Sequence, residues 1–182
     1  MGKYKGNLKK MDKSGRYFGV QDEGIAGITN GHWLIKYDPR LVELEPALAA
    51  HLEGGKGFSN CSGSLDLSGG SLPQLGLVLD KASMASDKHT GTKIAIVDGD
   101  LFSRLYVSES GEAVQVDQKS LDLLGPVLNE ADAIVGSSDA TGKDPLVFRK
   151  GGKILAVIMP IKTSAPDFLV MALKREARLT KG

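Results

Sequence analysis

The apolar stretch from Ile154 to Ile161 constrains the fold of this chain most. It reads Ile-Leu-Ala-Val-Ile-Met-Pro-Ile, so neither of its two alternating sets contains a charged side chain. Successive side chains of a β-strand point to opposite faces of the sheet, and a strand that is apolar on both faces must be covered on both. We therefore predict a strand from Lys153 to Ile161, buried in a sheet between helices or at a subunit contact.

Shorter strand patterns occur on both sides of this stretch. Near the start of the chain they predict three strands, at Arg16–Gln21, Gly24–Thr29 and His32–Asp38. Asn30-Gly31, between the second and third, is the strongest short hairpin signal. The remaining predicted strands are Lys93–Asp98, Ser103–Ser108, Glu112–Asp117, Ala133–Gly136 and Leu146–Arg149, with a hairpin turn at Glu109 to Glu112.

Helical patterns are fewer. A helix from Gln118 is predicted by Asp117 as its N-cap and by the common face of Leu121, Leu124 and Leu128, although Gly125-Pro126 should kink or interrupt it. Leu75–Met84 fits either a helix or a strand. Further predictions are short helices at Asn7–Lys13 and Leu41–Leu52, a loop or disordered insertion at Gly54–Pro73, and a helix from Asp167 or a terminal strand at Phe168–Leu173.

Together these patterns predict an α+β fold with antiparallel sheets and a few helices. A chain of 182 residues, 41% hydrophobic, is long enough for one domain with a core of its own. Ile154–Ile161 is far shorter than the roughly 18 apolar residues of a membrane span. The single cysteine, Cys61, cannot form an internal disulfide. We therefore expect a cytoplasmic protein without a membrane partner.

The formal net charge of +1 hides a separation of charge along the chain. Residues 1–16 carry a net charge of +5 and residues 168–182 carry +3, so the stretch between them carries −7. Basic ends on an acidic body could contact phosphates or could simply be solvated. The charge alone does not establish binding to nucleic acid.

Motifs of enzymes and metal sites are not evident. Gly136 to Lys143 differs from a phosphate-binding loop in its spacing, and Asp144 stands where that loop has Ser or Thr. His32, His51 and His89 are far apart, and Cys61 lies in a stretch poorly suited to hold a reactive geometry. The sequence therefore predicts no catalytic residues, no metal site and no cofactor.

Two acidic groups and one aromatic residue have both a functional and a structural interpretation. Asp98-Gly99-Asp100 and the acids at Glu130–Asp132 could bind a hard cation, but a turn after a strand explains the first group more simply. Trp33 could stack on a base, but a tryptophan within a strand is more often a core residue.

Two motifs resemble segments of bacterial DNA polymerase III beta subunits, the sliding clamps. Gly27-Ile28-Thr29-Asn30-Gly31-His32-Trp33-Leu34 resembles their Thr-Asp-Gly-His-Arg-Leu turn, and Ala156-Val157-Ile158-Met159-Pro160-Ile161-Lys162 is similar to their Val-Met-Pro-Met-Arg ending. Val116–Leu124 resembles the strand-to-helix junction of a clamp domain, with Asp117 in place of its proline. Asp144–Phe148 then takes the place of the penultimate strand.

This resemblance implies a single clamp-like domain over residues 1–182. Its two helix-plus-strands units would be residues 5–38 and 112–162, with a large insertion or connection at about 41–110. The chain departs from the pattern at Asn30 and Trp33, and it continues for twenty residues after Lys162. A bacterial clamp subunit has three such domains, so one domain would need a higher homo-oligomer to form a ring.

The resemblance also implies a non-enzymatic binding module of DNA replication that contacts double-stranded DNA or a replication protein. A phage or mobile-element origin would suit so reduced a version. The first alternative is a structural or protein-interaction protein that keeps the fold without DNA activity, and the second is an unrecognised enzyme that uses carboxylates and histidine. The candidate DNA contacts are Lys3, Lys5, Lys9, Lys10, Lys13, Lys174, Arg175 and Arg178. By position, Met159, Pro160 and Ile161 correspond to a pocket for partner peptides, with plain core packing as the simpler interpretation.

Overall fold

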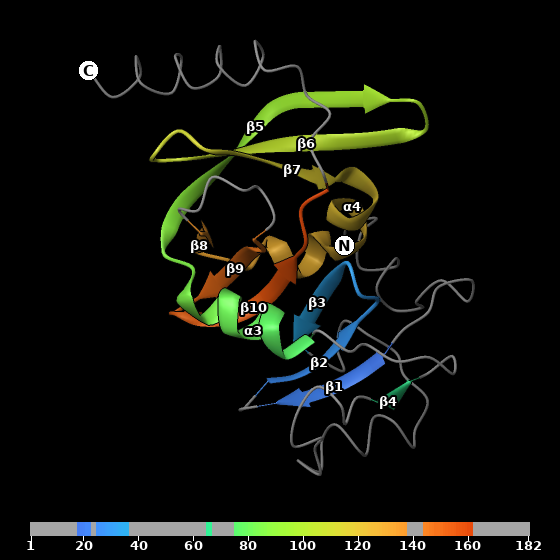
Figure 1. Cartoon of the computed structure of the whole chain (residues 1–182), viewed down its shortest axis with the longest axis vertical. Helices are drawn as coiled ribbons and strands as arrows, with labels where there is room; N and C mark the ends of the chain where they lie inside the picture. Colours follow the sequence, from blue (N-terminus) through green and yellow to red (C-terminus); the bar gives the residue numbers. More distant parts are fainter. Residues whose placement is uncertain (1–17, 23–24, 37–64, 67–74, 138–143, 162–182) are drawn as a thin grey trace.

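The computed structural model describes residues 18–22, 25–36, 65–66, 75–137 and 144–161. These residues form ten strands in one continuous sheet and two helices, α3 (Leu75–Met84) and α4 (Gln118–Leu128) (Figure 1). The strands are β1 (Phe18–Asp22), β2 (Ile25–Thr29), β3 (Trp33–Lys36), β4 (Leu65–Asp66), β5 (Asp87–Asp98), β6 (Leu101–Ser108), β7 (Ala113–Asp117), β8 (Ala133–Gly136), β9 (Leu146–Lys150) and β10 (Lys153–Ile158). Their order in the sheet is β4-β1-β2-β3-β10-β9-β8-β5-β6-β7.

Two three-stranded meanders form the middle of this sheet. Strands β1, β2 and β3 are one, strands β8, β9 and β10 are the other, and every neighbouring pair is antiparallel. The meanders meet through their last strands, because β3 pairs with β10 and places Leu34 opposite Val157. The order β1-β2-β3-β10-β9-β8 therefore has the symmetry of two equivalent units related by a two-fold axis.

The Asn-Gly hairpin predicted between the second and third strands is confirmed. Gly31 has φ of 91°, a backbone conformation that favours glycine. The Asn30 side-chain carbonyl accepts hydrogen bonds from the backbone N–H groups of His32 (2.9 Å) and Trp33 (3.1 Å). The turn is thus specified by the two residues that the sequence motif supplies.

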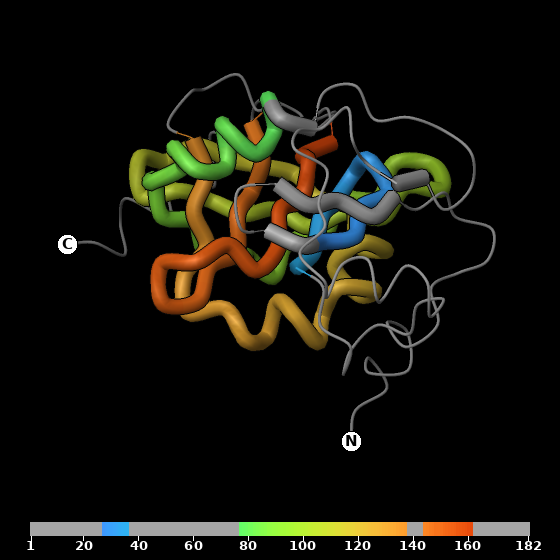
Figure 2. Tube along the Cα trace, turned by 90° about the horizontal axis from the view of Figure 1, so that it is seen from below, coloured from blue at the N-terminus to red at the C-terminus, as the bar shows by residue number. Residues whose placement is uncertain are grey.

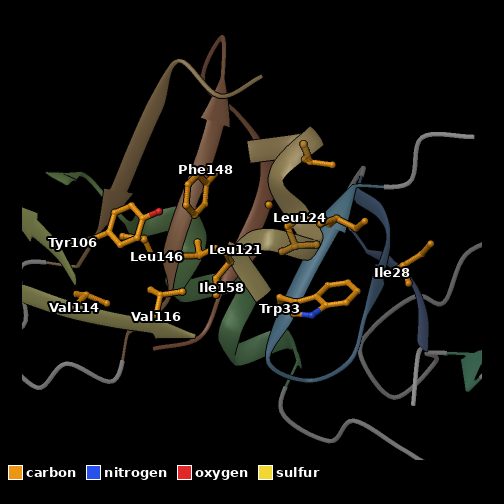
Figure 3. Packing of buried hydrophobic residues seen from close by; sticks show 13 residues of the cluster. Ile28, Trp33, Tyr106, Val114, Val116, Leu121, Leu124, Leu146, Phe148 and Ile158 are labelled. Atoms are coloured by element: carbon orange, nitrogen blue, oxygen red, sulfur yellow. The ribbon is translucent and has the colours of Figure 1, made fainter. Parts of the chain in front are cut away.

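The central strands are buried on both faces. Helix α4 packs on one face against a cluster that includes Trp33, Ile35, Phe148, Ala156 and Ile158 (Figure 3). On the other face, Leu34, Val147 and Val157 form a second cluster with Ala82 of α3 and with Ala85. Figure 2 shows α3 in green and α4 in gold on opposite sides of the strands. The two-sided burial predicted for the apolar stretch is confirmed for Ala156 to Ile158, and helices provide it.

Strands β5, β6 and β7 continue the sheet beyond β8 and curl toward α4. Tyr106 on β6 and the β7 residues Val114 and Val116 belong to the same core cluster as α4. The rings of Tyr106 and Phe148 pack edge to face, with centroids 6.1 Å apart. Helix α4 therefore packs against the central strands of the sheet and also against β6 and β7.

Several predicted boundaries need correction. The last strand ends at Ile158 instead of Ile161, and Pro160 has no N–H to continue its ladder. Helix α4 runs without interruption through Pro126, because Leu121, Leu124 and Val127 all anchor the same buried face. Strand β5 begins at Asp87, six residues before the predicted start. Leu75–Met84, whose apolar pattern fits either a helix or a strand, is helical.

Other predictions can be placed only in part. Within the predicted loop Gly54–Pro73, Leu65 and Asp66 form a short strand that pairs with β1. The predicted helices at Asn7–Lys13 and Leu41–Leu52, and the element after Asp167, lie outside the described residues. Among the described helices, none is long and apolar enough to cross a membrane.

Candidate functional site

The segment Met159-Pro160-Ile161 joins two distant parts of the sheet. The Met159 N–H donates to the carbonyl of His32, just before β3, at 2.7 Å. The Ile161 N–H donates to the carbonyl of Gln115 on β7 at 2.9 Å. All three residues of the segment are half-buried. The predicted pocket residues therefore lie where the end of β10, the start of β3 and the edge of β7 converge.

The β7 side of this junction is polar. Gln115 is 1% exposed, and its side-chain nitrogen donates to the Ser103 hydroxyl at 2.6 Å. Its side-chain oxygen is buried without a hydrogen-bond partner among the described residues. This hydrogen bond links the side chains of β6 and β7 inside the protein. The segment thus has an apolar side chain at each end and a polar strand edge beside it.

The outer surface of α4 is not suited to phosphate. Its exposed residues are Lys119 and Asp122, and Asn129 and Glu130 follow at its C-terminal end. Asp122 accepts a hydrogen bond from the Gln118 side chain at 2.7 Å, and Glu130 forms an ion pair with Lys150 at 3.2 Å. Contacts to DNA phosphates need an excess of Lys and Arg, which this surface lacks.

A polar group lies at the end of the core beyond Tyr106. The Ser110 hydroxyl donates to the Asp87 carboxylate at 2.7 Å, and the hydroxyls of Ser110 and Ser108 are 2.7 Å apart. His89, which pairs with Ser108 across β5 and β6, is 5% exposed. Its Nδ1 lies 2.9 Å from the Asp87 carbonyl oxygen, and its Nε2 is buried without a partner among the described residues.

His89 is fixed by packing as well as by hydrogen bonding. A Cβ atom placed on Gly136 of β8 would lie 2.6 Å from Cε1 of His89, so the ring rests directly on that glycine. Such close packing leaves no room for a substrate at this ring. His89 is a core histidine. Its neighbours could not be predicted from the sequence, because Ser108 and Gly136 are remote from His89 in the chain. His32, by contrast, is exposed in the turn before β3.

Burial also changes the acid–base chemistry of Tyr106. Loss of solvent raises the pKa of its phenol, and the positive charge of Arg104 offsets part of this rise. The phenol is therefore neutral at physiological pH and acts as an apolar ring with one polar end.

Of the remaining residues that the sequence singles out, some lie within the described residues and others lie outside them. Trp33 is 2% exposed and packs in the core, so stacking on a base is excluded for it. Asp98 ends β5 and Gly99-Asp100 forms the turn to β6, as the structural interpretation of this acidic group predicted. Within the described ranges, no group of three or more His, Cys, Asp or Glu residues could hold a metal ion.

The candidate DNA contacts lie outside the described residues, and so do Cys61 and His51. These candidate contacts are Lys3, Lys5, Lys9, Lys10, Lys13, Lys174, Arg175 and Arg178.

Comparison of the chain with protein-family models, with curated proteins and with solved structures found no match.

Proposed function

We propose that this chain is a non-enzymatic binding module with the architecture of a sliding-clamp domain, and that it contacts a replication protein. The observation that carries the proposal is the antiparallel pairing of β3 with β10. This pairing joins two three-stranded units through their last strands, and the second unit is preceded by β7 and α4. The resemblance implies units at residues 5–38 and 112–162. The described elements of the first unit are β1, β2 and β3, and those of the second are β7, α4, β8, β9 and β10.

The position of the Met159-Pro160-Ile161 segment supports a protein partner. The segment is half-buried and follows directly after the strand that joins the two units. Its backbone is held at both ends by hydrogen bonds to His32 and Gln115. A fixed backbone that carries apolar side chains suits recognition of a short apolar peptide, because little ordering is needed on binding.

The charges of α4 favour a protein over DNA at this part of the chain. Lys119 is accompanied on the exposed surface by Asp122 and by Glu130. Double-stranded DNA stays as a second candidate ligand because of the net charges of +5 and +3 at the two ends of the sequence. The connection between the two units, at about residues 41–110, contains α3, β5 and β6.

A peptide-binding measurement tests the proposal. A fluorescent peptide of the type by which polymerases bind clamps should bind the full chain in a polarisation titration. Met159→Asp should reduce its affinity by about tenfold or more, because a carboxylate placed in an apolar contact loses its hydration. Met84→Asp is the matched control, since Met84 on α3 is 79% exposed and lies outside the segment.

Two outcomes would contradict this proposal. One is absence of peptide binding by the unmodified chain. The other is equal binding by the unmodified chain and by a folded Met159→Asp variant, which would place the peptide elsewhere. Circular dichroism and thermal unfolding of both variants separate a lost contact from a lost fold.

A further inference from the structure

The β5–β6 hairpin has apolar side chains on its open surface. Val97 on β5 and Phe102 on β6 are directly paired across the two strands, and they are 70% and 41% exposed. Ala95, two residues before Val97 and on the same face, is exposed as well. Exposed apolar side chains grouped on one sheet face are typical of an interaction site.

The outer edge of β5 has no partner strand among the described residues beyond Lys88. Pairing with β8 is confined to Asp87 and Lys88, whereas the strand runs on to Asp98 (Figure 1). Asp98 and Leu101 flank a two-residue turn, and such flanking residues exchange hydrogen bonds with each other. The alternation of an antiparallel ladder then directs the backbone N–H and C=O groups of Val97 and Ala95 away from β6.

The charges on this hairpin are distributed unequally along its length. Lys88 and Lys93 are exposed in the first part of β5, and Asp98 and Asp100 are exposed at the tip. If two copies of β5 lie antiparallel, the basic part of each copy lies beside the acidic tip of the other. The strand is therefore complementary in charge to itself, and only in the antiparallel direction.

We propose that two copies of this chain associate by antiparallel pairing of their β5 edges. In the register centred on Ile96, Ala95 of each copy lies opposite Val97 of the other, so the four outward-facing backbone groups of each copy are paired. Lys93 then lies beside the turn that carries Asp98 and Asp100 of the second copy. Val97 and Phe102 of both copies form one apolar surface. This contact is isologous and closes as a dimer.

Sedimentation velocity of the full chain over a concentration series tests the pairing. The unmodified chain should shift from a monomer of 19.3 kDa toward a species of twice that mass. Lys93→Glu places an acidic side chain beside the acidic tip of the second copy, and the double variant Asp98→Lys/Asp100→Lys places a basic tip beside Lys93 of the second copy. Each variant alone should self-associate about tenfold or more weakly, because like charges then face each other.

Mixing the two variants supplies the decisive observation. A Lys93→Glu copy and an Asp98→Lys/Asp100→Lys copy place opposite charges together at both contacts, so the mixture should regain the dimer that neither forms alone. Leu77→Glu, at a 58% exposed position on α3, is the control and should dimerise as the unmodified chain does. If a charge variant does not fold, Val97→Thr provides a change that is compatible with a strand and should also weaken the dimer.

Three results would overturn the pairing. The first is a monomeric unmodified chain up to about 1 mM, a concentration at which even weak complexes form. The second is dimerisation of both charge variants with unchanged affinity. The third is a mixture that stays monomeric although both variants are folded.

Discussion

Asp144 is, with Tyr106, a described residue whose pKa the fold shifts from its ordinary value. The Lys81 ammonium group donates to its carboxylate, and this hydrogen bond lowers the pKa of Asp144 below its ordinary value of 3.8. Partial burial opposes the shift, and a hydrogen bond with Ser137 adds to it. The pair fastens the start of the β9 segment to α3, two elements that are distant in the sequence.

This shift predicts a pH dependence of stability. A carboxylate with a lowered pKa stabilises the folded state fully above its ordinary pKa, and the stabilisation is lost as the pH falls through the lower value. Asp144→Asn should therefore reduce the free energy of unfolding by up to about 1 kcal/mol at pH 6, since Lys81 is 44% exposed and the pair is screened. The difference should shrink below pH 3.8.

Urea unfolding at pH 6 and at successively lower pH measures this difference. Asp80→Asn, at the exposed residue next to Lys81, is the control and should change the free energy of unfolding at pH 6 less than Asp144→Asn does. A difference between Asp144→Asn and the unmodified chain that stays constant down to the lowest pH would contradict the assignment of the ion pair.

At the scale of elements, the N-terminus of α4 shows how a local signal sets a boundary. The Asp117 carboxylate accepts hydrogen bonds from the N–H groups of Lys119 (3.3 Å) and Ser120 (3.2 Å), and from the Ser120 hydroxyl (3.1 Å). These bonds satisfy donors that the first turn of a helix leaves free. Asp117 also ends β7, so one residue sets the junction of strand and helix.

Loss of this cap should destabilise the chain measurably. Asp117→Ala should reduce the free energy of unfolding by about 1 kcal/mol, whereas Asp117→Asn, which keeps a side-chain acceptor, should retain most of the stability. Asp122→Ala, on the exposed surface of the same helix, is the comparison and should change stability less. Equal losses for Asp117→Ala and Asp117→Asn would show that the charge, and not the hydrogen bonding, matters.

At the scale of the whole molecule, the separation of charge along the chain is the reason why double-stranded DNA stays a candidate ligand. Residues 1–16 carry +5 and residues 168–182 carry +3, whereas the body carries −7. Because the exposed surface of α4 is mixed in charge, binding to DNA would depend on the ends of the chain.

A salt titration of DNA binding tests this dependence. If the N-terminal segment contacts phosphates, changing Lys9, Lys10 and Lys13 together to Glu should weaken binding to all DNA sequences alike. The slope of log affinity against log salt should fall by the equivalent of up to about three contacts. Failure of the unmodified chain to bind DNA at low salt would remove this candidate ligand and leave the protein partner.

Features that depend on neighbouring residues can be predicted from the sequence. Apolar runs predicted the central strands, Asn30-Gly31 predicted its hairpin, and Asp117 predicted the start of α4. Each of these signals acts within about four residues, so it can be read without knowing what lies across the sheet. The two apolar faces of β10 likewise required cover on both sides.

Features that depend on residues far apart in the chain arise only in the folded protein. Leu75–Met84 fits two periods, and it is a helix because Ala82 packs against the second core cluster. The guanidinium group of Arg149 donates to the carbonyls of Ala82 (3.0 Å), Ser83 (3.1 Å) and Ala85 (3.1 Å) at the end of that helix. The pairing of β3 with β10 depends in the same way on contacts across more than 100 residues. No local pattern specifies such contacts, because their free energy arises only when both partners are already in place.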